Sequence, residues 1–224
     1  MRPRAAAIST PACGRVALAD SARPLAPTII PALLSVIRAF IAVPLPETIR
    51  VALAELSDRL ARGWPPGAVR WAGPEKLHLT LRFLGDTQED RVGSIAAGLD
   101  VLAADQPEFD LRLTSVGVFP NARRPRVIWV GLADEENELR ALHRSVEEMM
   151  CRLGWEPAPH RFKPHLTVGR VRHKAQPRDP QWVQSPPKLG FRVEGMDLIQ
   201  SRLSSAGAEY TCLHRASFAR GASA

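Results

Sequence analysis

One tetrapeptide pattern occurs twice in this chain of 224 residues and constrains its fold more than any other feature. The pattern is His-Leu-Thr followed by an aliphatic residue, at residues 78–81 and again at residues 165–168. Each copy lies in a segment typical of a β-strand, and each follows a stretch with apolar residues at helical spacing. A motif that recurs at matching places in two halves of a chain indicates two related half-domains.

Strand geometry assigns the residues of each copy to opposite faces. Successive side chains of a strand point in opposite directions, so His78 and Thr80 share one face and the aliphatic residues share the other. The same holds for His165 and Thr167 in the second copy. If a pseudo-twofold axis relates the halves, both polar faces line one groove. Two imidazoles and two hydroxyls then surround a single anion.

This set of groups suits the cleavage of a phosphodiester. The reaction needs a base to activate a nucleophile and an acid to protonate the leaving oxygen, and histidine serves both roles because its ordinary pKa of about 6.5 is near neutrality. A single His-x-Thr pattern on a strand is usually structural, whereas two matched copies favour an active site. Neither an HExxH motif nor a Cys/His ligand spacing occurs, so we expect no metal and no other cofactor.

The rest of the chain predicts an α+β fold with antiparallel pairing. Apolar residues at helical spacing predict three helices, over residues 46–62, 88–104 and 135–153. Continuous or alternating apolar runs predict the strands, which cover residues 36–44, 69–71, 77–84, 109–118, 127–132, 165–171, 190–203 and 207–218. The last two strands are expected to form a hairpin.

Composition narrows the class of protein and of partner. Hydrophobic residues make up 45% and charged residues 24%, which is ordinary for a folded globular protein and excludes collagen, coiled coil and wholesale disorder. The net charge of +7 and the pI of about 10.1 favour an anionic partner such as RNA.

The N-terminal segment differs from the remainder. Residues 1–35 are rich in Ala, Pro, Ser and Arg without periodicity, so we expect a disordered extension or an upstream start, with a transit peptide as a less favoured third interpretation. One domain over residues 36–220 is expected to follow. The most apolar window, residues 29–46, contains Arg38 and three prolines, which argues against a membrane span. Three cysteines without a CxxC pair predict a reduced, cytoplasmic protein, and we expect a monomer with no obligate protein partner.

Five segments make the chain resemble a known family. They are IRAFIAVPLP, VRWAGPEKLHLTLRFLGD, GVFPNARRPRVIWVGL, RFKPHLTVGRV and DLIQSRLSSAGAEYTCL, and they span about residues 36–218. Together with the doubled motif they are similar to the 2H phosphoesterases, specifically to the RNA 2′,3′-cyclic phosphodiesterases, also called bacterial 2′-5′ RNA ligase-like proteins. No His or Thr position of the motif departs from the family pattern.

The resemblance implies a two-lobed α+β fold in which antiparallel sheets line a central cleft and helices lie outside. It implies a hydrolase that converts a terminal 2′,3′-cyclic phosphate of RNA to a 2′-phosphomonoester without a metal. By analogy with the family, His78 protonates the departing 3′ oxygen and His165 activates water, while Thr80 and Thr167 hold phosphate oxygens. Symmetry alone does not distinguish the acid from the base.

Two arginines near the motifs are candidates for binding phosphate, since guanidinium groups stabilise developing negative charge. Arg82 has even spacing from His78, so a regular strand places both on one face. Arg170 has odd spacing from His165, so a regular strand turns it away and a bulge at Gly169 is needed to bring it back. We predict that both arginines face the groove.

Three further residues are candidate RNA contacts. Arg124 and Arg126 lie in the turn NARRPR, which is equally typical of a loop that binds the RNA backbone and of a solvated basic loop. Phe40 is a candidate for stacking on the terminal base, as aromatic residues do with unpaired nucleotides. A buried core position is the more favoured interpretation of Phe40.

Three other functions remain open on the sequence. The same site can carry 2′-5′ ligation of RNA, which reverses the chemistry and uses the same histidines. A phosphodiesterase for a small cyclic nucleotide also fits, although the basic turn favours RNA. A non-catalytic module that binds RNA ends fits less well, because binding alone does not need two titratable groups. The physiological RNA is not indicated by any residue.

Overall fold

A computed structural model of the chain describes residues 35–172, 175–204 and 207–219. The predicted extension over residues 1–35 lies outside the described residues, apart from Ser35. No helix among the described residues is both long enough and apolar enough to cross a membrane.

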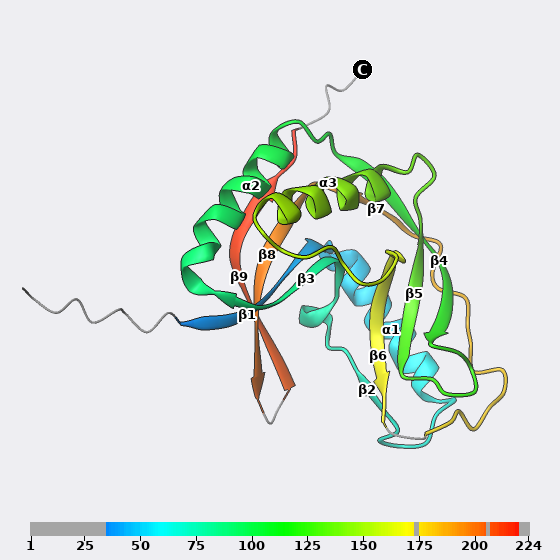
Figure 1. The fold of residues 1–224 in the computed structure, drawn as a ribbon. Coiled ribbons are helices and arrows are strands. Elements are labelled where there is room, and N and C mark those ends of the chain that lie inside the picture. The colour runs from blue at the N-terminus through cyan, green and yellow to red at the C-terminus, as the bar shows by residue number, and fades with distance from the viewer. Residues whose placement is uncertain (1–34, 173–174, 205–206, 220–224) are drawn as a thin grey trace, which may run out of the picture. The chain divides into compact units, whose positions relative to one another are not determined.

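The described strands form two sheets in which every pair is antiparallel (Figure 1). The four-stranded sheet has the order β3 (His78–Gln88), β1 (Val36–Pro44), β8 (Gly195–Ser204) and β9 (Gly207–Ser217). The five-stranded sheet has the order β2 (Val69–Trp71), β6 (His165–Val171), β5 (Val127–Ala133), β4 (Phe109–Phe119) and β7 (Gly190–Val193). The predicted α+β class with antiparallel sheets and two lobes is confirmed.

Three α-helices complete the fold at the predicted places: α1 (Glu47–Ala61), α2 (Val92–Ala104) and α3 (Glu138–Arg152). Single 3₁₀ turns at Pro74–Lys76 and Glu89–Arg91 precede β3 and α2. Helix α2 packs on β8 and β9, α3 contacts β3 and α2, and α1 contacts β6. One buried apolar cluster draws on both sheets and all three helices, so the two lobes share a core.

The two motif strands lie in contact although they belong to different sheets. Strand β3 is at one end of the four-stranded sheet, and β6 lies between β2 and β5 in the other. His78 begins β3, and His165 begins β6. In both motifs the aliphatic side chains are buried and the His and Thr side chains are half-buried. The predicted alternation of the two motifs is therefore confirmed.

Two predicted strands are wrong in their extent. The strand predicted over residues 77–84 continues to Gln88, so the helix predicted over residues 88–104 begins only at Val92. Residues 190–203 form two strands, β7 and β8, which belong to different sheets and are separated at Glu194. The Glu194 carbonyl accepts a hydrogen bond of 2.8 Å from the Phe218 amide. At Gly195 a Cβ atom would lie 2.6 Å from the Ala216 carbonyl oxygen. Glycine is needed there because the chain passes close to β9 as it changes sheets.

Candidate active site

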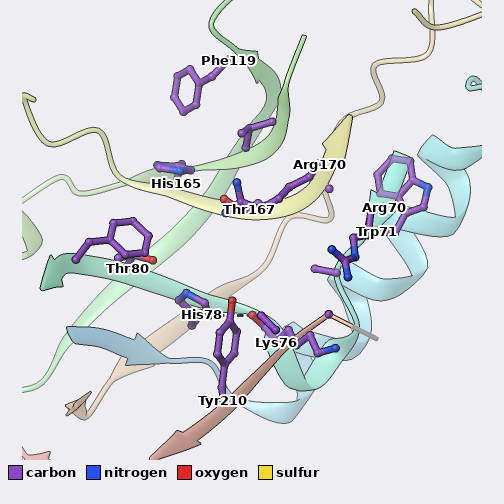
Figure 2. A pocket seen from close by; sticks show the side chains of 16 residues that line it. Arg70, Trp71, Lys76, His78, Thr80, Phe119, His165, Thr167, Arg170 and Tyr210 are labelled. Atoms are coloured by element: carbon purple, nitrogen blue, oxygen red, sulfur yellow. Dashed lines mark hydrogen bonds between the residues drawn. The ribbon is translucent and has the colours of Figure 1, made fainter. Parts of the chain in front are cut away.

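Both motifs line one pocket with a volume of about 310 Å³ (Figure 2). His78 and Thr80 reach it from β3, and His165 and Thr167 reach it from β6. This size suits a small ligand or one nucleotide, since ligand pockets begin at about 300 Å³. The pocket therefore brings together the four side chains whose convergence the repeat predicts.

The two imidazoles are held in the same way. His78 Nδ1 lies 2.8 Å from the Lys76 carbonyl oxygen, and His165 Nδ1 lies 2.7 Å from the Lys163 carbonyl oxygen. A carbonyl oxygen only accepts, so each Nδ1 carries a hydrogen and donates it. The Nε2 atom of each neutral ring is then left to accept or return a proton. Each strand thus fixes its histidine through the backbone two residues earlier.

Aromatic side chains surround His78. The Phe40 ring lies 4.7 Å from the His78 ring, centroid to centroid, and the Tyr210 ring meets it edge-on at 5.3 Å. Burial under these rings is the largest cause that lowers the pKa of His78 to about 4; Arg170 and His165 nearby contribute in the same direction, and the hydrogen bond to the Lys76 carbonyl opposes the shift. In the free protein at neutral pH His78 is therefore uncharged.

His165 has its own aromatic neighbours. Phe119 meets its ring edge-on at 5.1 Å between centroids, and Trp129 packs on Phe119 at 5.1 Å. The Trp129 indole in turn fills the space beside Gly117, where a Cβ atom would lie 2.2 Å from it. Tight packing along β4 and β5 thus determines where Phe119 sits against His165.

The pocket is strongly cationic. Arg70, Arg170 and Lys76 line it, and no Asp or Glu is among its described lining residues. Arg70 and Arg170 are direct cross-strand neighbours on β2 and β6. Gly207, at φ +129°, leaves room for the Arg70 guanidinium, which a Cβ atom there would approach to 2.7 Å. An anion is the natural occupant of such a site.

The predicted placement of Arg170 is confirmed, through a bulge one residue from the expected position. The pairing of β5 with β6 shifts register between Ile128, opposite Gly169, and Trp129, opposite Thr167. Val168 therefore has no partner, and Arg170 returns to the pocket side beside Thr167 (Figure 2).

The predicted placement of Arg82 in the pocket is wrong, because β3 also contains a bulge. The pairing of β1 with β3 shifts between Ala42, opposite Thr80, and Ile41, opposite Arg82, so Leu81 is the extra residue. Arg82 is turned away from the histidine pocket and is buried. Its guanidinium donates to the Glu147 carboxylate and to the Glu156 carbonyl, so it is not available to phosphate.

Of the three candidate RNA contacts, one is buried, one lines a groove beside the pocket and one lines neither cavity. Phe40 is only 3% exposed and packs against His78, so base stacking by Phe40 is wrong and the core interpretation is correct. Arg126 is exposed and lines a groove that adjoins the histidine pocket. Arg124 is exposed in its turn and lines neither the pocket nor the groove.

Several residues of the pocket had no sequence signal. Tyr210 comes from β9, Arg70 from β2 and Phe119 from the end of β4. Lys76 and Phe83 flank the first motif closely enough for their proximity to be expected from the sequence, but their direction depends on the turn and the bulge. Among the described residues, no three His, Cys, Asp or Glu side chains are grouped to bind a metal ion.

Comparison with known proteins gives consistent matches. The model of the family described as LigT-like phosphoesterase matches residues 43–129 and again residues 130–210. An RNA 2′,3′-cyclic phosphodiesterase of Thermus thermophilus is 38% identical over 188 residues, which cover 80% of this chain and 88% of the relative. One of Methanothermobacter thermautotrophicus is 34% identical over 183 residues, covering 78% and 95%.

Solved structures match the fold over the same span. The crystal structure of the Thermus thermophilus protein TT0787 gives a TM-score of 0.68 at 30% identity and covers 81% of this chain and 98% of that one. The crystal structure of Escherichia coli LigT complexed with 3′-AMP gives a TM-score of 0.66 at 26% identity, covering 82% and 99%.

Proposed function

The chain belongs to the LigT-like phosphoesterase family, and from this premise we propose that it is a hydrolase that opens the terminal 2′,3′-cyclic phosphate of RNA to a 2′-phosphomonoester. The observation that carries the proposal is the pair of half-buried His/Thr faces that meet across one cationic pocket. We assign the activity to the domain over residues 36–220.

The two histidines supply both proton transfers of the reaction. His165 Nε2 takes a proton from a water molecule whose oxygen forms a new bond to phosphorus. The bond from phosphorus to the 3′ oxygen breaks, and His78 Nε2 gives its proton to that oxygen. The phosphate stays on the 2′ oxygen, and the proton on His165 returns to solvent as His78 is protonated again. Positioned acids and bases each contribute about 10²- to 10⁴-fold to such a rate.

The remaining lining groups bind the charge of the phosphate. The Thr80 and Thr167 hydroxyls donate to its non-bridging oxygens, and the Arg170 guanidinium offsets the negative charge that grows in the transition state. This assignment needs no metal ion, because both proton transfers and the charge stabilisation come from side chains.

His78 must hold a proton before it can act as the acid. Its pKa is about 4 in the free protein, so few molecules carry that proton at neutral pH. A bound phosphate places negative charge beside the ring and raises its pKa, because an opposite charge favours the protonated form. Substrate binding thereby supplies the acid with its proton.

The cysteines bear on the compartment in which the reaction takes place. The two cysteines among the described residues, Cys151 and Cys212, are free thiols, which suits a reducing compartment. We propose a cytoplasmic protein on this ground, and we keep the expectation of a monomer that acts on RNA ends without a membrane or an obligate protein partner.

One experiment tests the activity and its main alternative. The wild-type protein is incubated in EDTA with an oligoribonucleotide that ends in a 2′,3′-cyclic phosphate, and the product is identified by ³¹P NMR. We expect a 2′-phosphomonoester. A 3′-phosphomonoester, or an unchanged cyclic end, contradicts the proposal. A parallel reaction with added 5′-hydroxyl RNA measures 2′-5′ ligation, which appears as a longer product.

A further inference from the structure

We propose that the groove beside the histidine pocket binds the nucleotides immediately upstream of the cyclic phosphate, so that the enzyme selects an RNA chain end over a cyclic mononucleotide. The groove has a volume of about 1380 Å³ and runs over β3 and the segment from residue 154 to residue 163. This inference rests on the proposed function and specifies how the same site engages its substrate.

The groove continues directly from the pocket. The two cavities share part of their walls, including His165, Thr80, Phe83 and Phe119. The histidine pocket, at about 310 Å³, is of the size of one nucleotide, so the rest of an RNA substrate must leave it. A cyclic phosphate is at the 3′ end, and the departing chain is therefore the 5′ side. The groove opens from the pocket that holds the reacting phosphate, so the 5′ chain can lie along it.

Phe83 lies at the junction of the two cavities. Its side chain is 67% exposed, and its neighbour Phe40 is 3% exposed beneath it, with 5.9 Å between ring centroids. Phe83 lines both cavities, so its exposed ring is in contact with the space that a bound RNA chain would occupy. Aromatic faces of this kind stack on the bases of single-stranded RNA. Phe83 therefore stacks on the base of the nucleotide next to the reacting one.

The groove also carries the charge that an RNA backbone requires. Its described wall has five Arg or Lys side chains and two carboxylates, Asp86 and Glu156. Two of the five cations, Arg82 and Arg91, are engaged inside the protein. The other three, Arg126, Arg161 and Lys163, are exposed and form no ion pair with a described residue, although Lys163 Nζ lies 5.6 Å from the Phe119 ring centroid. They are free to contact phosphates.

The segment that forms the outer wall is held in place from beneath. The buried Arg82 donates to the Glu156 carbonyl, and Arg91 donates to the Leu153 carbonyl and lies 4.6 Å over the Trp155 ring. The Glu147 carboxylate accepts from the Ala158 amide at 3.1 Å. These contacts anchor the segment to β3, to the 3₁₀ turn after it and to α3. The groove is thus preformed, which reduces the ordering cost of binding a flexible chain.

The test compares two substrates with the same terminal nucleotide, a cyclic mononucleotide and a hexaribonucleotide with a 2′,3′-cyclic phosphate end. We expect wild-type kcat/KM to be at least about tenfold higher for the hexamer. In the double variant Arg126→Ala/Arg161→Ala, the hexamer-to-mononucleotide ratio of kcat/KM falls about tenfold. The slope of log kcat/KM for the hexamer against log salt also becomes shallower, by about 0.7 for each RNA phosphate that the variant no longer neutralises. Phe83→Ala lowers the same ratio.

Arg144→Ala is the matched control, because Arg144 is exposed on α3 and lines neither cavity. It leaves the ratio and the salt slope unchanged. Equal kcat/KM for both substrates in the wild type, or an unchanged ratio in the double variant, overturns the proposal. Urea unfolding of each variant verifies that its fold is intact.

Failure of the proposed function is recognised separately. A wild-type protein that converts neither substrate contradicts the cyclic phosphodiesterase activity. The groove is then tested by fluorescence anisotropy with a labelled hexaribonucleotide that ends in a 2′-phosphate. A Kd raised about tenfold by the double variant supports the groove, and an unchanged Kd overturns it.

Discussion

Phe40 packs against His78, the first residue of β3, with 4.7 Å between their ring centroids. Tyr210 covers the same imidazole edge-on at 5.3 Å and also meets Phe40 at 5.2 Å. On the sequence alone, Phe40 is a candidate for base stacking. Its place beneath the imidazole instead makes it a positioning residue that controls how readily His78 takes a proton.

The protonation of His78 is open to direct measurement. We expect an NMR titration of the free protein to give His78 a pKa of about 4, and saturating inorganic phosphate to raise it. Phe40→Ala admits water to the ring and moves the pKa upward toward 6.5 without any anion. His78→Gln identifies the resonance. A pKa near 6.5 in the free wild type contradicts this account of the site.

The same burial makes stability depend on pH. The unfolded chain protonates His78 at its ordinary pKa of 6.5, whereas the folded protein does so only at about 4. Between these values the unfolded state binds more protons, so the free energy of unfolding decreases as pH falls from 6.5 toward 4. We expect this residue to account for up to about 3 kcal/mol of that loss. Urea unfolding between pH 7 and pH 4 should therefore show a smaller loss in His78→Gln than in the wild type.

The buried pair of Arg82 and Glu147 is a structural element, and replacing one partner alone is expected to cost more than replacing both. Arg82→Met leaves the Glu147 carboxylate without its main partner and removes the donor to the Glu156 carbonyl. We expect a loss of about 3–5 kcal/mol in the free energy of unfolding. The double variant Arg82→Met/Glu147→Leu recovers part of this loss. Denaturant unfolding measures both, and a loss below about 1 kcal/mol for the single variant is contrary to expectation.

Packing behind His165 can be probed through a glycine. In Gly117→Ala the new methyl group overlaps the Trp129 ring, which must move together with Phe119. We expect kcat to fall by up to about 10²-fold, because a shift of about 1 Å at a catalytic group has that effect. Gly93→Ala on α2 is the control, since nothing lies within 4 Å of its new Cβ atom. Equal kcat values for the two variants contradict the role of this packing.

The sequence predicted the features that depend on the alternation of side chains along a strand and on the repeated motif. The two motifs alternate as any regular strand does, so the directions of His78 and Thr80 follow from spacing alone. Bulges break that rule, because one unpaired residue reverses every direction after it. The bulge at Leu81 gives Phe83, in place of Arg82, a position on the pocket. Spacing could not show this, since the bulge depends on how β1 pairs with β3.

Other features of the site depend on the packing of distant parts of the chain. Tyr210 and Arg70 reach the pocket from β9 and β2, each from a different sheet. Neither residue is near a motif, and only the pairing of whole strands brings them there. The division of residues 190–203 between two sheets also depends on a distant part of the chain. At Gly195 the backbone passes close to β9, and spacing along the sequence does not show this contact.

The most direct test of the central claim is the turnover of a cyclic-ended hexaribonucleotide in EDTA by the wild type, His78→Ala and His165→Ala, with binding of the 2′-phosphate product measured in parallel. Two histidines that act as acid and base predict that each variant loses at least about 10²-fold in kcat while still binding the product. Turnover by either variant within a few-fold of the wild type contradicts the two-histidine mechanism.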